Sequence, residues 1–521
     1  MSTPAVAPGP ARTRISLARV AVLVVCVLVA GWVGTRAISS AVTPQRVVPS
    51  PTFSGYVDVT ATPAYAFETP RGAAQSHVTL AFVVSGSEGA CTPMWGGAYS
   101  LDRASSDLDL DRRISQLRLV GGDVRVSFGG QAGTELAATC TDQGALADTY
   151  RTVVDRYELT SIDLDLEGTS QGDAAAAARR AGAVKQVQDD VRATGHPLAV
   201  WLTLPVAPTG LTDEGEGVLA GMLAAGVDVA GVNGMTMDFG AAAAPGRTMA
   251  AQAVDASTAL QRQVRGAFEN AGRPLDDDAA WRRVGITPMI GQNDVQSERF
   301  TLDDAEAVNA FARTHGVGQV SMWSLNRDAT CAPPLPAVLP VVQTSCSGVD
   351  QAGRSFADVL AAHLDTTRPS STSSPSAAPT RPVGSATEAS GTGVVDDPAH
   401  SPFPVWDPLG RYPGGTKIVW HRQVYLARYW TTGVAPDMPV ANPADSPWTL
   451  VGPVLPGDTP APLPTVPAGT YPAWDPKQTY TAGMRVQLGL VPYEAKWWSQ
   501  GQKPGESAVG GSPWLLVTPG S

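Results

Sequence analysis

Histidine and cysteine are scarce in this sequence. Its 521 residues include 6 histidines and 5 cysteines. A zinc site needs cysteine or histidine ligands clustered at short spacings, and no such spacing occurs here. We therefore expect no metal site and no cofactor. The histidines, including His77 and His196, also form no pattern with a nucleophile, which argues against serine or cysteine hydrolase chemistry.

Basic residues are also few. Lysine and arginine number 37 against 48 acidic residues, which gives a formal charge of -11 and a pI of about 5.1. Proteins that bind nucleic acid usually carry a basic patch, so we expect no nucleic-acid partner. A neutral polymer substrate is compatible with this charge. The hydrophobic content of 43% allows a real core, and the length predicts two to four domains.

The N-terminus has the pattern of an export segment. Three arginines, the last of them Arg19, precede an apolar stretch over residues 20–34. This stretch is short for a membrane-spanning helix, which needs about 17–25 apolar residues. We expect a cytoplasmic segment over 1–14 and a signal peptide or uncleaved membrane anchor over 15–37. In either case the rest of the chain is extracellular, secreted or anchored to the membrane.

Four cysteines remain when Cys26, inside the apolar stretch, is set aside. In an oxidising compartment they predict two disulfides, for which three pairings are possible. A Cys331–Cys346 bond would close a short proline-rich loop, and this leaves Cys91–Cys140 as the second bond.

Short apolar runs alternate with amphipathic stretches from about residue 50 to 365. Helical periodicity covers 146–157, 173–193 and 302–314, between most of the runs. This alternation predicts a parallel sheet, and eight strands suit a (β/α)8 barrel, with a doubly wound sheet as the alternative. The expected strands are 55–60, 77–85, 123–129, 161–167, 198–205, 231–238, 284–290 and 317–325.

The composition changes after residue 365. A stretch rich in serine, threonine and proline predicts a linker over 366–400. Beyond it, the Trp-Asp-Pro sequence at Trp406 recurs at Trp474, and other positions repeat with the same offset. Such a repeat indicates two copies of one small all-β module. We expect module 1 over 401–451, a proline-rich linker over 452–470 and module 2 over 471–518.

The segment Ser161–Glu167 carries the most specific chemistry. Because strand side chains alternate, Asp163, Asp165 and Glu167 share one face. Three carboxyl groups on a covered face are costly unless they have partners or a task. Their proximity should raise at least one pKa, as a general acid requires. The alternative is a solvated edge strand with an acidic face.

The segment Ile162–Glu167 resembles the D-x-x-D-x-D-x-E signature of glycoside hydrolase family 18, the chitinases. The resemblance covers roughly residues 50–350, our expected catalytic domain. Further similar segments are Val126–Gly130 on the third strand, Met235–Phe239 on the sixth, Val320–Ser324 on the eighth, and Thr287–Asn293 and Cys91–Gly97, which are similar to a bacterial subgroup.

The resemblance implies a retaining, substrate-assisted mechanism. Glu167 would protonate the glycosidic oxygen and then act as base, while the substrate's own acetamide attacks the anomeric carbon. Asp165 would orient the acetamide, with Asp163 behind it, and Asp238 would bind the acetamide or the water. The residues expected to bind substrate are Trp323, Met235, Ser127 and Gln292.

Two departures from the family pattern stand out. Thr160 and Ser161 occupy the positions of the usual Asp-Gly, so the innermost acid is missing, which puts the pH profile in doubt. Met237 replaces a tyrosine whose hydroxyl would hold the acetamide. Between the seventh and eighth strands, 25–30 residues leave room for one loop and one helix. The extra domain found there in processive relatives is missing, which favours endo-type cleavage in an open groove.

The repeat is similar to carbohydrate-binding modules of families 5 and 12, through Tyr493–Gly501 and its more divergent twin Tyr425–Gly433. Adjacent aromatics in so small a module cannot all be buried, and exposed rings can stack on sugars. We expect sugar contact from Tyr429, Trp430, Trp497 and Trp498. For Trp406, Trp448, Trp474 and Trp514 we favour a place in the core.

The sequence thus favours a monomeric endo-chitinase that acts on chitin or a similar polysaccharide. Two alternatives stay open. One is a chitin-binding protein with an inactive barrel, against which the presence of Glu167 argues. The other is a related endo-β-N-acetylglucosaminidase that acts on glycoprotein glycans or peptidoglycan, against which the chitin-type modules argue.

Overall fold

The computed structural model describes residues 52–86, 89–195, 197–333, 335, 338–364, 396, 401–440, 442, 445–460, 463–505 and 512–517. The expected segments 1–14 and 15–37 lie outside these residues, as does the expected linker 366–400 apart from Asp396. Within the described part of the chain, no helix has both the length and the apolar character needed to cross a membrane.

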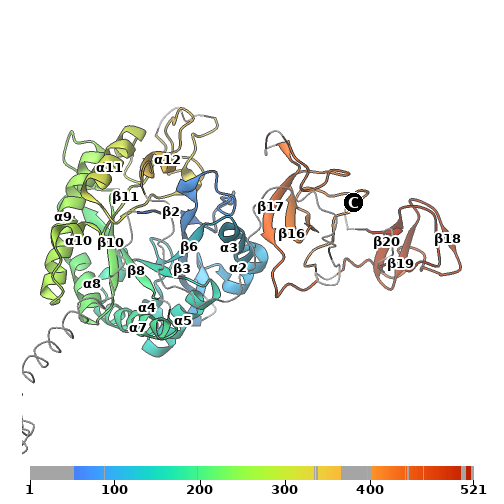
Figure 1. The fold of residues 1–521 in the computed structure, drawn as a ribbon, viewed down its shortest axis with the longest axis horizontal. Coiled ribbons are helices and arrows are strands. Elements are labelled where there is room, and N and C mark those ends of the chain that lie inside the picture. Colours follow the sequence, from blue (N-terminus) through green and yellow to red (C-terminus); the bar gives the residue numbers. More distant parts are fainter. Residues whose placement is uncertain are drawn as a thin grey trace, which may run out of the picture. The chain divides into compact units, whose positions relative to one another are not determined.

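A parallel sheet forms the centre of the N-terminal part of the described chain, between residues 52 and 364 (Figure 1). Neighbouring strands are hydrogen-bonded in the order β14-β11-β10-β8-β7-β6-β3. Every one of these pairs is parallel. The strands are β3 (His77–Gly86), β6 (Asp123–Gly129), β7 (Ser161–Asp165), β8 (Ala199–Ala207), β10 (Val229–Met235), β11 (Val284–Thr287) and β14 (Gln319–Val320).

The segment 52–58 lies between the two ends of this row of strands. β1 (Thr52–Phe53) pairs with β14, and β2 (Gly55–Asp58) pairs with β3, both in parallel. Only Ser54 separates the two short strands, and its amide donates to the Val320 carbonyl at 3.1 Å. The first and last parallel strands are therefore joined through one short segment.

Helices alternate with the strands along the chain and lie around the sheet (Figure 1). Several helices begin at an aspartate or threonine whose side chain accepts a hydrogen bond from a backbone amide of the first turn, as at Asp142, Asp173 and Thr301. The principal helices are α3 (Leu110–Leu119), α5 (Gln143–Arg156), α7 (Ala174–Ala193), α8 (Asp213–Ala224), α9 (Met249–Asn270) and α11 (Leu302–His315).

One continuous apolar core joins these helices to the strands. On β7 and just after it, Ile162, Leu164 and Leu166 are all fully buried in this core. The alternate residues Asp163 and Asp165 therefore point to the opposite face, away from the helices. The alternation of apolar and acidic residues in this segment therefore places the apolar side chains against the helices and the acidic side chains on the inner face of the sheet.

The expected strands are present, but several end earlier than the sequence suggests. β7 stops at Asp165, β11 at Thr287 and β14 at Val320. Beyond these ends the chain still makes backbone hydrogen bonds between strands, for example from Trp323 to the Pro288 carbonyl at 3.0 Å. The apolar residues continue past the end of each regular strand, because their side chains are still buried there. An apolar run in the sequence therefore does not show where the regular β-pairing ends.

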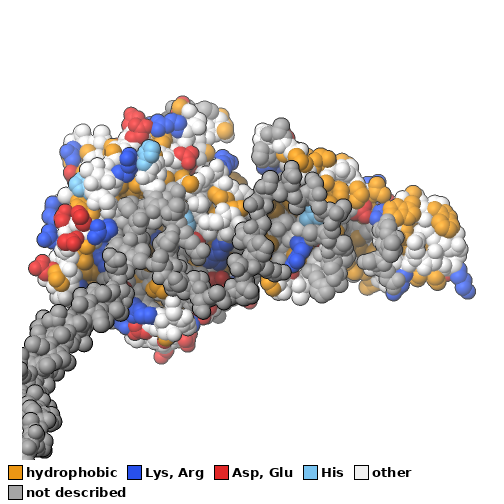
Figure 2. Space-filling model, in the orientation of Figure 1, with side chains coloured by type: hydrophobic (Ala, Val, Ile, Leu, Met, Phe, Trp, Pro, Cys, Tyr) orange, Lys and Arg blue, Asp and Glu red, His pale blue; other side chains and the backbone are white. Residues whose placement is uncertain are grey.

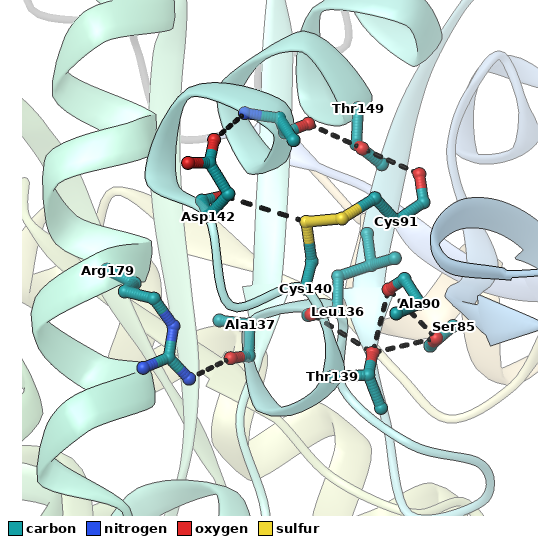
Figure 3. The surroundings of a disulfide bond; sticks show 11 residues. Ser85, Ala90, Cys91, Leu136, Ala137, Thr139, Cys140, Asp142, Thr149 and Arg179 are labelled. Carbon is teal, nitrogen blue, oxygen red and sulfur yellow. Dashed lines mark hydrogen bonds between the residues drawn. A yellow bond between two sulfur atoms is a disulfide. The ribbon is translucent and has the colours of Figure 1, made fainter.

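The Cys91–Cys140 disulfide ties a hairpin to the segment after β6 (Figure 3). Cys91 lies in β4 (Gly89–Trp95), which is antiparallel to β3, and Cys140 ends the short helix α4 (Leu136–Thr139). Next to the bond, the Thr139 hydroxyl donates to the Ala90 carbonyl at 2.9 Å. Thr149 of α5 donates to the Cys91 carbonyl at 2.8 Å. The second expected disulfide, Cys331–Cys346, is present as well.

Small antiparallel sheets make up the C-terminal region. One consists of β15 (Lys417–Trp420), β16 (Gln423–Ala427) and β17 (Trp448–Pro453). Another consists of β19 (Arg485–Leu488), β20 (Val491–Ala495) and β22 (Trp514–Leu516), and β18 (Thr479–Tyr480) pairs with β21 (Ser499–Gln500).

The sequence repeat reappears there as a repeat of hydrogen bonds. The Tyr412 hydroxyl binds the backbone of Asp407, and the Tyr480 hydroxyl binds that of Asp475 in the same way. The indole of Trp448 donates to the Val434 carbonyl at 2.9 Å, and that of Trp514 donates to the Gln502 carbonyl at 2.7 Å. Each copy of the repeat therefore contains the same tyrosine and tryptophan hydrogen bonds.

Removing the Cys91–Cys140 bond with C91A/C140A should lower the free energy of unfolding by about 2–4 kcal/mol, because the bond closes a long loop in the unfolded chain. The two cysteines are 49 residues apart, against 15 for Cys331 and Cys346. C331A/C346A is the matched control and should cost less. Denaturant unfolding of the oxidised proteins measures both, and a larger loss for the shorter loop would contradict the prediction.

Candidate functional site

The acid row lies on a central strand. β7 pairs with β6 on one side and with β8 on the other, so it is not an edge strand. Asp163 is 1% exposed and Asp165 is 4% exposed. The alternative of a solvated acidic face is therefore wrong. Glu167 follows the strand at its carboxyl end, where active sites lie in this class of parallel sheet.

Asp163 is held by three hydroxyl groups from three different strands. Tyr56 of β2 donates to it at 2.9 Å, Ser127 of β6 at 2.7 Å and Thr203 of β8 at 2.7 Å. Burial raises the pKa of Asp163, while these donors and the charge of Arg125 oppose that rise. Hydrogen bonds of this kind favour the ionised form, which is an acceptor only.

The pKa values of the next two acids are raised as well, with nearby charges adding to burial. Burial, with the charges of Glu167 and Asp163, raises the pKa of Asp165 well above its usual value. Burial also raises the pKa of Glu167 to about 7, with a contribution from the charge of Asp238, while a hydrogen bond from Asp165 works against the rise. Near neutral pH, Glu167 is therefore poised to give or take a proton.

A pocket opens above this row. Met235 and Trp323, both expected from the sequence, line it together with Asp165, Glu167 and Asp238. Acidic, apolar and hydroxyl side chains and the amide of Gln131 line it, with no lysine, arginine or histidine among the lining residues. The other lining residues are Tyr56, Phe82, Gln131, Thr203, Met237, Thr287, Met289 and Asp294.

Two expected substrate-binding residues do not line this pocket. Ser127 is fully buried and its hydroxyl is used by Asp163. Gln292 is 3% exposed, and its amide both donates to the Leu339 carbonyl at 2.6 Å and accepts from the Leu339 amide at 3.1 Å. Ser127 therefore supports the acid row, and Gln292 fastens the loop that the Cys331–Cys346 bond closes.

Aromatic rings form one side of the pocket. Trp323 stacks on Phe82 with the ring centres 5.4 Å apart, and Tyr56 meets Trp323 edge-on at 6.0 Å. Sequence reasoning missed Phe82 and Tyr56 as site residues, although both fall within expected strands. It also missed Gln131 and Asp294, which directly follow the motifs at Val126–Gly130 and Thr287–Asn293; those motifs were the available signal.

Asp238 faces the pocket from just after β10. Its φ of 48° turns the chain there, and its carboxylate accepts from the Val295 amide at 2.8 Å. Burial raises the pKa of Asp238. Its neighbour Met237 lines the pocket where the family pattern has a tyrosine, so the hydroxyls among the lining residues come from Thr203, Thr287 and Tyr56.

Exposed aromatic side chains mark the C-terminal sheets. Tyr429 is 52% and Trp430 59% exposed, and Trp497 and Trp498 are 41% and 61% exposed. Hydrophobic side chains gather on the surface over these sheets in Figure 2. In contrast, Trp448 and Trp514 are buried in the cores of their sheets, with Trp406 and Trp474 packed beside them.

These observations define the kind of site. Neighbouring carboxyl groups with raised pKa values, beside a stacking indole, are suited to acid–base chemistry on a sugar. In the part of the chain that the structure describes, no group of three or more histidine, cysteine or acidic residues could hold a metal ion.

Comparisons with known proteins agree with this class. The probable bifunctional chitinase/lysozyme of Escherichia coli (strain K12) is 39% identical over 305 residues, 57% of this chain and 33% of that protein. Endochitinase 11 of Metarhizium anisopliae is 37% identical over 324 residues, 60% of this chain and 58% of that protein. The chain thus spans about a third and somewhat over half of the lengths of these relatives. No protein-family model matches it.

Among solved structures, the catalytic domain of a hyperthermophilic chitinase from Pyrococcus furiosus is 28% identical with a TM-score of 0.50. The match covers 60% of this chain and 93% of that one. The central region is accordingly a mixed α/β domain that matches a chitinase catalytic domain.

The D238N substitution should lower the pKa of Glu167 below about 7, because the charge of Asp238 is one of the causes that raise it. Infrared difference titration of the carboxyl groups, with the Glu167 band assigned by its loss in E167Q, measures the shift. D213N, which removes an exposed acid on α8, is the control and should leave the pKa in place. An unchanged or higher value in D238N would contradict the assignment.

Proposed function

We propose that the protein is an endo-acting chitinase that hydrolyses β-1,4 linkages of N-acetylglucosamine with retention, by substrate-assisted catalysis. The observation that carries the proposal is the acid row itself. Asp163, Asp165 and Glu167 follow one another toward a pocket with an indole on its side, and the pKa of Glu167 is about 7. The names of the relatives agree with this substrate.

In the proposed reaction, protonated Glu167 donates its proton to the glycosidic oxygen as the bond to the leaving sugar breaks. The carbonyl oxygen of the substrate's acetamide attacks the anomeric carbon from the other side and forms an oxazolinium ion. Asp165 orients the acetamide nitrogen and stabilises the positive charge, supported by Asp163. Glu167 then takes a proton from water, which attacks the anomeric carbon and restores the acetamide.

The remaining pocket residues place the sugar. Trp323 lies beneath the ring in the cleavage subsite, supported by Phe82, and Asp238 binds the acetamide or the incoming water. Met235 contacts the same sugar. No hydroxyl comes from position 237, so Thr203 and Thr287, which also line the pocket, are the candidates to replace it.

The domain organisation follows from the same proposal. Residues 50–350 form a closed (β/α)8 barrel, supported by the pairing of β1 with β14 and of β2 with β3. Residues 401–451 and 471–518 form two chitin-binding modules with linkers over 366–400 and 452–470, except that β17 carries the sheet of the first module on to Pro453. The repeated contacts of Trp448 and Trp514 support two copies of one module.

The mode of cleavage and the location are part of the proposal. Between β11 and β14 the chain forms only the short pair β12 (Gly291–Gln292) and β13 (Arg299–Phe300) and helix α11. This leaves no extra domain to wall the groove, which favours endo-type cleavage. The two disulfides support an extracellular place of action.

Substitution E167Q should reduce kcat on a soluble chitin oligosaccharide by about 10²–10⁴-fold, because the general acid is lost while its shape is kept. Wild type should release products whose first anomer is β. Reaction progress by NMR measures the rate and the anomer together. Binding of both proteins to chitin beads is the control, since E167Q should still bind.

Three outcomes would overturn this assignment. Wild-type binding to beads without cleavage would favour the chitin-binding protein with an inactive barrel. Cleavage of glycoprotein glycans or peptidoglycan in preference to chitin would favour the related endo-β-N-acetylglucosaminidase. Products that first appear as the α anomer would exclude the substrate-assisted mechanism.

The double substitution W497A/W498A should weaken binding to chitin beads by roughly tenfold or more, since each ring face that leaves a sugar loses about 1–2 kcal/mol of apolar contact. Hydrolysis of the soluble oligosaccharide should stay unchanged. L490A is the matched control, because Leu490 is an apolar side chain in the turn between β19 and β20, 50% exposed. Equal losses in both variants would show that the tryptophans have no specific role.

A further inference from the structure

The inner face of the sheet continues below the acid row. One step before Asp163 on this face lies Ser161, and one step before Ser127 lies Arg125. β6 and β7 pair with Ser127 opposite Asp163, so Arg125 and Ser161 are neighbours in the layer beneath. The guanidinium of Arg125 donates from Nε to the Ser161 hydroxyl at 2.9 Å.

Two further contacts fix this guanidinium in place. Its Nη1 donates to the Gln319 side-chain oxygen at 2.5 Å, across the sheet on β14. It also lies over the Trp201 ring, 5.4 Å from the ring centre. Trp201 in turn packs on Gly231, where an added Cβ would come within 2.4 Å of the ring. Contacts with residues of β7, β8 and β14 therefore hold the guanidinium of Arg125, which is on β6, at the inner face of the sheet.

Its position matters because Asp163 is buried beside a second carboxyl group. The three hydroxyls that hold Asp163 are neutral donors, and a buried carboxylate is costly without a positive charge nearby. The two layers are separated by the rise of two residues along a strand, roughly 7 Å. Arg125 is partly buried and Asp163 is 1% exposed, so at that distance the guanidinium acts on the carboxylate with little water between them.

We propose that Arg125 is a positioning residue of the acid row: from the layer beneath, its fixed positive charge keeps Asp163 ionised. Asp163 thereby stays an acceptor for Tyr56, Ser127 and Thr203. This inference rests on the proposed function only for its effect on the reaction.

The groups that face Asp163 support this role. Tyr56 of β2 and Asp165 of β7 are the other titratable groups next to it, and burial raises the pKa of both. The charge of Arg125 lowers the pKa of Asp163, against the effect of burial. The remaining contacts on the inner face, from Ser127, Thr203 and their neighbour Asn233, are uncharged.

The test compares R125Q, which keeps a polar side chain without the charge, with R125K, which keeps the charge. Infrared difference titration follows the protonation of Asp163, with its band assigned by its loss in D163N. The pH of half-protonation should rise by about one unit or more in R125Q and stay near the wild-type value in R125K. Q319E, which sets an anion against Arg125, should also raise it and covers the case in which R125Q does not fold.

Hydrolysis adds a second readout. In R125Q the acid limb of the kcat/KM profile should move to higher pH while KM changes little, because Arg125 does not line the pocket. R125K should restore the wild-type limb. Thermal unfolding at each pH shows that the enzyme is folded during the assay.

Several results would overturn the proposal. An unchanged or lower half-protonation pH for Asp163 in R125Q or Q319E would remove its basis. The same holds if R125K behaves like R125Q, since charge would then not be the cause. If wild type cleaves no chitin, the proposed function fails, but the infrared titration still decides whether Arg125 keeps Asp163 ionised.

Discussion

Three carboxyl groups placed in succession along one buried face of a strand would repel one another and resist leaving water. The surroundings of β7 affect each of these acids. Three hydroxyls donate to Asp163, burial and neighbouring charges raise the pKa of Asp165 well above its usual value, and the pKa of Glu167, at the carboxyl end of the strand, is raised to about 7. Each acid is thereby accommodated in a different way, and the differences are what acid–base chemistry requires.

The hydrogen-bond partners of the acid row come from several strands. The partners of Asp163 come from β2, β6 and β8, and Asn233 of β10 donates to Thr203 behind them at 3.1 Å. Only strands whose inner faces converge on one interior can bring these groups together. The helices contribute indirectly, because burying Ile162 and Leu164 against them directs the acids inward.

Much of this arrangement could be predicted from the sequence. The period-2 pattern at Ser161–Glu167 identified the inner face, and the alternation of strands and helices identified the sheet. What the sequence could not supply is which polar residues meet across the sheet. Ser127 and Gln292 sit in recognisable motifs, yet one bonds to Asp163 and the other to a loop, because strand stagger and loop closure decide such contacts. Phe82, Tyr56 and Asp294 reach the pocket for the same three-dimensional reason.

In the proposed reaction, the substrate's own acetamide is the nucleophile above this acid row. A crystal structure of the E167Q protein with a chitin oligosaccharide would show where that acetamide lies. We expect a sugar over Trp323 whose acetamide nitrogen meets Asp165 and whose carbonyl oxygen lies about 3 Å from the anomeric carbon. An acetamide turned away from Asp165, or a carboxylate of the protein placed for attack on that carbon, would contradict it.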